Sequence, residues 1–148
     1  MASSRNLNRH TRVAALANVQ KLAARAALGR ARDAEDDALA SLASAGAERD
    51  QTLQFWQERL LAPVLDPLLF GQLTHLLANN EIAYDEAEQI SKSAQSQVLE
   101  RQAYLGEAES RHSALKRALA RTRRKLSRKR EDAAESEREC GAHRGARS

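Results

Sequence analysis

Residues 61–70 read Leu-Ala-Pro-Val-Leu-Asp-Pro-Leu-Leu-Phe and contain both prolines of the 148-residue chain. A proline disfavours helical geometry in the residue before it, so Pro63 predicts that a helix ends at about residue 61. Asp66 followed by Pro67 is a favourable helix start, with the aspartate as N-cap and the proline at the first helical position. The predicted bend over 62–66 is short enough to return the chain antiparallel to itself.

The sequence on both sides of the bend has the composition of long helices. It is 42% hydrophobic but only 3% aromatic, so it lacks the large side chains that fill a wide globular core. Much of it is Ala, Leu, Glu, Arg and Gln, which are strong helix formers. We therefore expect an all-α fold, a long two-helix antiparallel coiled-coil hairpin over 1–136. Helix one is expected at about 9–61, helix two at about 67–134 and a disordered C-terminal tail over 137–148.

Seam positions in both expected helices recur in alternating steps of three and four. Helix one has a poor seam, because four of its ten positions are not apolar. Helix two has an extra step of four from Ala94 to Val98, which predicts a stutter that locally relaxes supercoiling. The seam expected for helix one is Leu28, Arg32, Glu35, Leu39, Leu42, Gly46, Arg49, Leu53, Trp56 and Leu60. The seam expected for helix two is Leu69, Leu73, Leu76, Asn80, Ala83, Ala87, Ile90 and Ala94, then Val98, Arg101, Leu105, Ala108, His112, Leu115, Leu119, Thr122 and Leu126.

Positive charge gathers near both ends of the chain. Residues 1–30 hold six Lys or Arg and residues 111–130 hold ten, both without an acid, whereas residues 31–110 hold fifteen Asp or Glu against five Lys or Arg. A hairpin folded at the bend brings the two basic stretches together, where they repel. The basic stretch is either a solvated helix face or a site for an acidic protein surface or pore, or for nucleic acid. Nucleic acid is the less favoured partner, because the basic stretch has no aromatic residue for base stacking.

The sequence has no catalytic or metal-binding pattern. Its four histidines, at positions 10, 75, 112 and 143, are scattered, and it has no phosphate-binding glycine loop. Cys140 is the only cysteine, so neither an intramolecular disulfide nor a thiolate metal cluster can form. No apolar run approaches the ~18 residues of a membrane span. We expect a cytoplasmic protein that is not an enzyme and uses no cofactor.

Large apolar side chains crowd into the bend and allow two interpretations. They either staple the hairpin closed, or their surplus forms a partner site at the tip, and both can hold at once. We expect Trp56 and Leu60 to be stapling residues, and Leu65 and Phe70 to be exposed.

A cytoplasmic chain of this length that is almost wholly one antiparallel coiled coil, with charged helix ends, resembles the central-stalk proteins of type III secretion systems. These are the flagellar FliJ and injectisome SctO (YscO-like) proteins. The resemblance covers the whole chain and rests on its length, helix pattern and Ala/Arg/Glu/Gln composition. It implies a non-catalytic stalk of a bacterial flagellar or virulence apparatus, linking the hexameric export ATPase to the export gate at the cytoplasmic face of the complex. Some members of the family also handle secretion chaperones.

On this resemblance, the basic helix ends meet the ATPase ring and the apolar tip meets the export gate or a chaperone. Any contact with a membrane is expected only through the secretion complex. The alternative hypothesis is a basic coiled-coil protein associated with nucleic acid. The residues expected at the ATPase ring are Arg5, Arg9, Arg12, Arg121, Arg123, Arg124 and Arg128, and those expected at the tip site are Leu65, Leu69 and Phe70.

Overall fold

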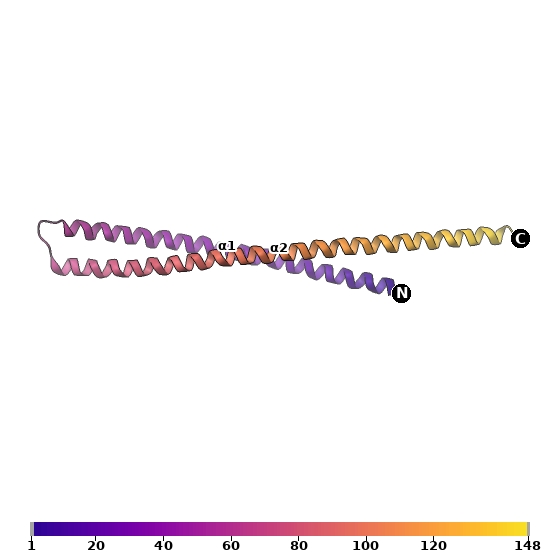
Figure 1. The fold of residues 1–148 in the computed structure, drawn as a ribbon, viewed down its shortest axis with the longest axis horizontal. Coiled ribbons are helices and arrows are strands. Elements are labelled where there is room, and N and C mark those ends of the chain that lie inside the picture. The colour runs from indigo at the N-terminus through magenta and orange to yellow at the C-terminus, as the bar shows by residue number, and fades with distance from the viewer. Residues whose placement is uncertain (1, 148) are drawn as a thin grey trace. The chain divides into compact units, whose positions relative to one another are not determined.

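The computed structural model describes residues 2–147, with side chains from Ser4 onward. Two helices account for nearly all of these residues (Figure 1): α1, Ala2–Leu60, and α2, Pro67–Gly145. No strand occurs within residues 2–147. The two helices pack against each other as a helical hairpin, which confirms the expected all-α class.

The first helix ends where the sequence places a proline. The Leu61 N–H donates to the carbonyl of Gln57 at 3.2 Å, and the Ala62 N–H donates to the carbonyl of Arg59 at 3.3 Å. The second bond spans three residues instead of four, so the helix tightens in its last turn. Pro63 follows and has no N–H with which to continue the helix.

The second helix begins at the predicted aspartate cap. The Oδ1 atom of Asp66 accepts hydrogen bonds from the N–H groups of Leu68, at 3.0 Å, and Leu69, at 3.4 Å. These two N–H groups have no partner within the helix, so the carboxylate satisfies them. Pro67 is the first helical residue, as expected, because its missing N–H costs nothing there.

Two units are distinguished by the contacts within the chain, and each contains one stretch of each helix. We call residues 1–24 with 104–148 the terminal unit, and residues 25–103 the bend unit.

In the bend unit, the contact faces of both helices differ from the expected seams at every second position. The observed faces still follow steps of three and four, so the expected period is right and the expected register is partly wrong. The buried or half-buried positions of this face on α1 are Leu28, Ala31, Glu35, Ala38, Leu42, Ala45, Arg49, Thr52 and Trp56. Those on α2 are Phe70, Leu73, Leu77, Asn80, Tyr84, Ala87, Ser91, Ala94 and Val98.

Small residues take the places where large ones were expected. Leu39 is 41% exposed and Ile90 is 61% exposed, whereas their neighbours Ala38 and Ser91 are buried. Small side chains at the contact let two helices approach closely, and the adjacent large side chains then lie on the flanks. The expectation of a poor seam in helix one is therefore right in part: Ala31 and Ala45 take the places of Arg32 and Gly46, whereas Glu35 and Arg49 remain in the contact face.

The expected stutter of helix two is absent for the same reason. Ser91, not Ile90, precedes Ala94 in the buried set, so a step of three leads to Ala94 and a step of four to Val98. This is the ordinary heptad alternation, and nothing interrupts it at Ala94.

Two polar layers lie within the contact face of the bend unit. The Asn80 amide donates to the Thr52 hydroxyl at 2.7 Å, and the Arg49 guanidinium lies 3.9 Å from the centre of the Tyr84 ring. Desolvation opposes the charge of Arg49, but its hydrogen bond to Asp50 and nearby negative charges raise the pKa of the guanidinium. A one-residue slip would separate both pairs, so these layers define the register.

In the terminal unit, alanine again forms the closest contacts. Ala17, Ala24 and Ala108 are the buried apolar residues, and α2 adds half-buried leucines at 105, 115, 119 and 126. Val19, on the outer face of α1, remains 60% exposed. Burial stabilises a protein by roughly 0.8 kcal/mol per CH₂ group. Alanine buries little apolar area, so this contact contributes little to stability.

Both helices extend further than expected. The first begins at Ala2 instead of at about residue 9, and the second continues to Gly145 instead of ending at about 134. The predicted disordered tail over 137–148 is therefore wrong as far as Gly145, because this stretch has no proline and is rich in helix formers. Met1 and Ser148 lie outside the described residues.

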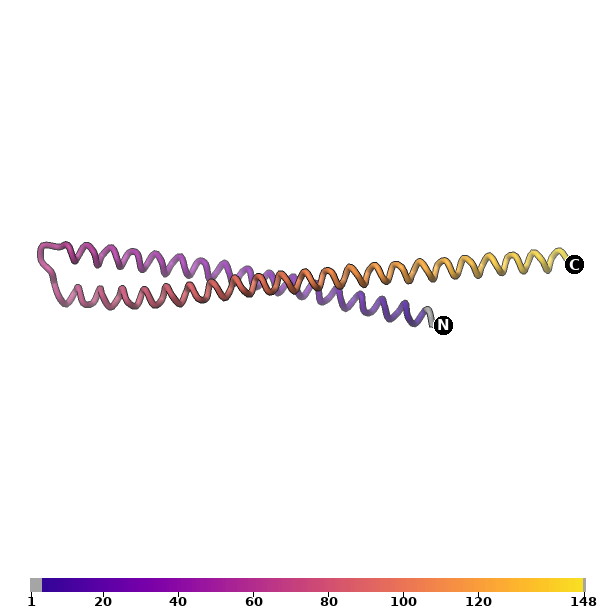
Figure 2. Tube along the Cα trace, viewed as in Figure 1, coloured from indigo at the N-terminus to yellow at the C-terminus, as the bar shows by residue number. Residues whose placement is uncertain are grey.

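Beyond Lys129, the last part of α2 has no helix packed on it in the described part of the chain. Every residue from Ser127 to Arg147 is exposed, and Figure 2 shows this stretch continuing past the start of α1. The Ser127 hydroxyl donates to the Glu131 carboxylate at 3.0 Å, one helical turn away. We call residues 127–145 the α2 extension.

Candidate functional site

Basic side chains from both helices come together in the terminal unit. This unit holds seventeen Lys or Arg against seven Asp or Glu, whereas the bend unit holds seven against thirteen. The terminal unit therefore has an excess of ten positive charges, and the bend unit an excess of six negative charges. The separation of charge that the sequence predicts thus coincides with the division into two units.

The first turns of α1 carry three of the expected site residues on one face. Arg5, Arg9 and Arg12 are exposed and follow one another at steps of four and three, and together with Asn8 and Val13 they line a shallow depression. Residues at these steps are neighbours on a helix surface.

A groove of about 330 Å³ lies between the start of α1 and α2, and we call it the terminal groove. Thr122 and Leu126 are half-buried and form its floor, while the cationic side chains are exposed along its wall. The residues that line the groove are Asn6 and His10 from α1 and Thr122, Lys125, Leu126, Arg128 and Lys129 from α2.

Only one of the expected α2 arginines lines this groove. Arg128 does so, whereas Arg121, Arg123 and Arg124 are exposed on α2 outside it. Lys125 and Lys129 belong to the groove and were not chosen from the sequence. Their signal was their spacing of four beside the predicted seam residues Thr122 and Leu126, which brings them to the edge of the helix contact.

A titratable pair lies in the contact face of the terminal unit. The Lys21 ammonium lies 3.4 Å from His112 Nδ1, and His112 is half-buried on the seam where the sequence places it. Desolvation lowers the pKa of His112 below its ordinary value of 6.5, and the charges of Lys21 and Lys116 lower it further. The neutral imidazole can accept a hydrogen bond from the ammonium.

The apolar tip differs in part from the expected one. Leu65 is 48% exposed, as expected, but Phe70 is half-buried and packs against Trp56, with ring centroids 5.3 Å apart and ring planes tilted by 34°. Trp56 is a stapling residue, as predicted, and its Nε1–H also donates to the Thr74 hydroxyl at 3.1 Å. Leu60, expected to staple, is 48% exposed.

The exposed apolar residues of the tip lie within and beside the bend itself. Leu69 is half-buried, so of the three expected residues only Leu65 is largely accessible. Residues in a loop lack a facing helix, which is why the apolar side chains there remain in solvent. The tip surface consists of Leu60, Leu61, Val64, Leu65 and Leu68, which are 48–84% exposed.

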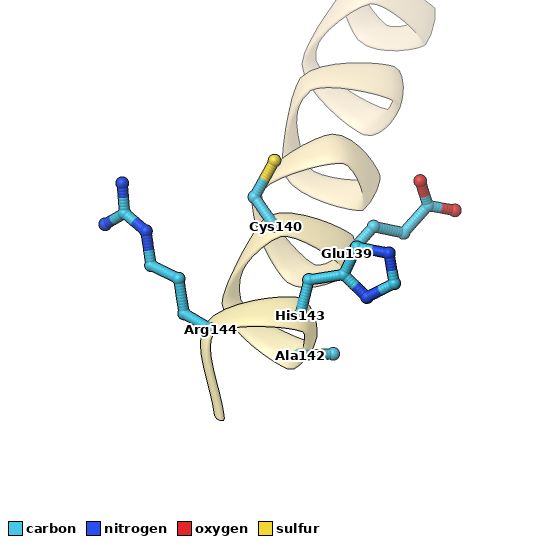
Figure 3. Close-up of a pocket in the computed structure, with 5 residues that line it drawn as sticks. All are labelled: Glu139, Cys140, Ala142, His143 and Arg144. Carbon is cyan, nitrogen blue, oxygen red and sulfur yellow. The ribbon is translucent and has the colours of Figure 1, made fainter. Parts of the chain in front are cut away.

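A hollow at the end of α2 does not form a reactive site. Glu139, Cys140, Ala142, His143 and Arg144 line it, and all five come from one helix and are exposed (Figure 3). The Cys140 thiol and the His143 ring point to different sides of the helix. They do not form the hydrogen-bonded pair that activates a thiolate.

Among residues 2–147, no group of three or more His, Cys, Asp or Glu is arranged to hold a metal ion. None of the helices in the described part of the chain has a stretch apolar and long enough to cross a membrane.

Comparison with known proteins returned no relative. No family model, no curated protein and no solved structure matches the chain.

Proposed function

We propose that this protein is a non-catalytic coupling stalk of a type III secretion apparatus, an antiparallel coiled coil that links the hexameric export ATPase to the export gate. The observation that carries the proposal is the terminal unit, in which basic side chains of both helices form one strongly positive end. A ring-shaped ATPase with an acidic pore is a suitable partner for such an end. On this proposal, the protein works in the bacterial cytoplasm at the secretion complex.

The bend unit supplies the second contact of the proposed stalk. Its tip surface has five exposed apolar residues in nine positions, a density that marks a surface for protein contacts. We assign the export gate, or a secretion chaperone, to this surface, with Leu61, Val64 and Leu68 added to the expected Leu65.

Binding to the ATPase tests the proposal directly. The variant Arg121→Glu, Arg124→Glu, Arg128→Glu is expected to lose capture of the hexameric ATPase. Its glutamates would repel the acidic pore that the arginines attract. A matched control reverses Arg30, Arg32 and Arg59, which are exposed in the bend unit, and is expected to retain capture. Equal capture of the ATPase by both variants would count against the assignment.

The same positive end favours nucleic acid as the second candidate partner. If this alternative holds, the protein binds unrelated duplex DNA, and its affinity falls steeply as salt is raised. Fluorescence anisotropy with a labelled duplex at several salt concentrations, with and without the ATPase, separates the two. DNA binding that the ATPase does not displace would favour the nucleic-acid function.

A further inference from the structure

A stripe of opposite charges runs along one face of α2, from Arg121 into the α2 extension. Successive steps of four, three, four, three and four join Arg121, Lys125, Arg128, Asp132, Glu135 and Glu139. These steps keep all six side chains on one face of the helix. Three basic residues thus come first and three acidic residues follow, and all six are exposed.

Among the six members of the stripe, most neighbouring charges have the same sign. Arg121 and Lys125 are like charges one turn apart, and Glu135 and Glu139 are also like charges one turn apart. Like charges at this spacing destabilise a helix. Only Arg128 and Asp132, at the centre, are opposite charges one turn apart. The acidic half of the stripe lies where α2 is exposed over its whole circumference, and a single helix of this kind is marginally stable in water.

The stripe is symmetric about Arg130 with its signs exchanged. Arg128 and Asp132 lie two positions from this centre, Lys125 and Glu135 lie five, and Arg121 and Glu139 lie nine. A second, antiparallel copy of the helix, related by a two-fold axis at Arg130, therefore places an acid opposite every base. A two-fold contact of this kind uses the same surface on both copies and closes on itself.

We propose that two copies of this protein associate antiparallel through the stripes of their α2 helices. The acidic half of each stripe lies along the basic half of the other copy. Lys125 and Arg128 also line the terminal groove, so the acidic half of the second copy is seated at the edge of that groove. This association does not depend on the proposed secretion function.

Several ion pairs, side by side along the two helices, determine the strength of this dimer. Exposed pairs are individually weak and are screened by salt, so the dimer forms at low ionic strength and dissociates at high ionic strength. We expect sedimentation equilibrium to give a dimer at about 50 mM NaCl and a monomer at about 500 mM NaCl. A monomer at both salt concentrations, at high protein concentration, would overturn the proposal.

Charge exchange between two variants tests the pairing itself. One variant carries Asp132→Lys, Glu135→Lys and Glu139→Lys, and the other carries Arg121→Glu, Lys125→Glu and Arg128→Glu. Each variant alone is expected to be monomeric at low salt, and an equimolar mixture is expected to form a heterodimer in which every pair is again opposite. Dimers of either variant alone, or no heterodimer, would contradict the pairing.

The matched control reverses three exposed acids of the bend unit, Asp33, Asp36 and Asp37. It changes net charge by the same amount as the acidic-stripe variant and is expected to remain dimeric. The acidic-stripe variant keeps all the arginines assigned to the ATPase, so capture of the ATPase by this variant separates a failure of the dimer from a failure of the proposed function.

The single exposed cysteine reports the geometry without any substitution. Cys140 lies ten positions beyond Arg130, so the two cysteines of the dimer are separated by about 30 Å along the helix axis, at 1.5 Å per residue. Pulsed electron–electron double resonance between spin labels on the two Cys140 residues is expected to show a distance near this value at low salt only. A much shorter distance would indicate a parallel dimer and overturn the antiparallel arrangement.

Discussion

Single residues decide how closely the two helices approach. Ala38 and Ala94 are buried in the bend unit beside Leu28 and Val98, and Ala17, Ala24 and Ala108 are buried in the terminal unit. Alanine excludes little water, so each contact contributes little by itself. The hairpin therefore depends on many small contacts and on the polar pairs between them.

Two glycines in α1 provide a matched test of this close contact. A Cβ added at Gly29 meets nothing within 4 Å, whereas one added at Gly46 lies 3.4 Å from the Tyr84 ring. We expect Gly29→Leu to raise the free energy of unfolding by about 0.5–1 kcal/mol, from helix propensity alone.

Gly46→Leu is expected to lower that free energy, because its branched side chain displaces Tyr84 and disturbs the Arg49–Tyr84 contact. Urea unfolding followed by circular dichroism measures both variants. A Gly46→Leu protein as stable as Gly29→Leu would show that Tyr84 does not constrain this position.

The His112–Lys21 pair makes stability depend on pH. Because the pKa of His112 is lowered from 6.5 in the folded protein, the unfolded chain binds a proton more readily. The stability is therefore fully retained above pH 6.5 and decreases as the pH falls from 6.5 through the folded-state pKa. Thermal melting is measured at pH 7.5 and at pH 5.5. Between these two pH values, His112→Gln is expected to lose less stability than the natural protein. The control variant, His75→Gln, is expected to lose as much as the natural protein. The same pH dependence in all three proteins would exclude this role.

At the scale of whole helices, the bend is held by a cap at one end and a staple beside it. The Asp66 carboxylate accepts hydrogen bonds from two N–H groups of α2. Trp56 of α1 packs against Phe70 of α2, and its Nε1–H donates a hydrogen bond to the Thr74 hydroxyl. The cap defines where α2 starts, and the staple defines how the first turn of α2 faces the last turn of α1.

Removing the cap is expected to weaken the second helix. Asp66→Ala leaves two N–H groups without a side-chain acceptor and is expected to lower the free energy of unfolding by about 1 kcal/mol. Asp66→Asn keeps an acceptor oxygen and is expected to lose much less. Asp37→Ala, in the middle of α1 and exposed, serves as the control. Equal stability of the Ala and Asn variants would mean that the cap contributes nothing.

At the scale of the whole molecule, charge is distributed unevenly along the chain. The terminal unit has an excess of ten positive charges and the bend unit an excess of six negative charges, although the net charge is only +4. Like charges from two helices held together within one unit repel, and salt screens this repulsion.

Salt is therefore expected to stabilise the folded monomer. At a protein concentration too low for dimers, the free energy of unfolding is expected to rise between about 50 mM and about 500 mM NaCl. Hydrogen exchange is expected to place the gain in the terminal unit, with much less change in the bend unit. A fall in stability with salt would show that attraction between opposite charges outweighs this repulsion.

Local chemistry in the sequence was sufficient to predict the two helices, the bend and the separation of charge. Pro63 and the Asp66-Pro67 pair act on their immediate neighbours, and charges can be counted along the chain, so no knowledge of packing is needed for these features. The seam period was also right, because it follows from helix geometry.

The tertiary structure alone decided which face of each helix is in contact. Ala38 and Leu39 are adjacent and both apolar, and only the close approach of the second helix makes the smaller one the buried one. In the same way, Ser91 is buried in place of Ile90, so the expected stutter is absent. Phe70 packs against Trp56 and is therefore half-buried, although it was expected to be exposed at the tip. Local propensity cannot decide which of two neighbouring positions is buried, because their difference in free energy arises only when the partner helix is present.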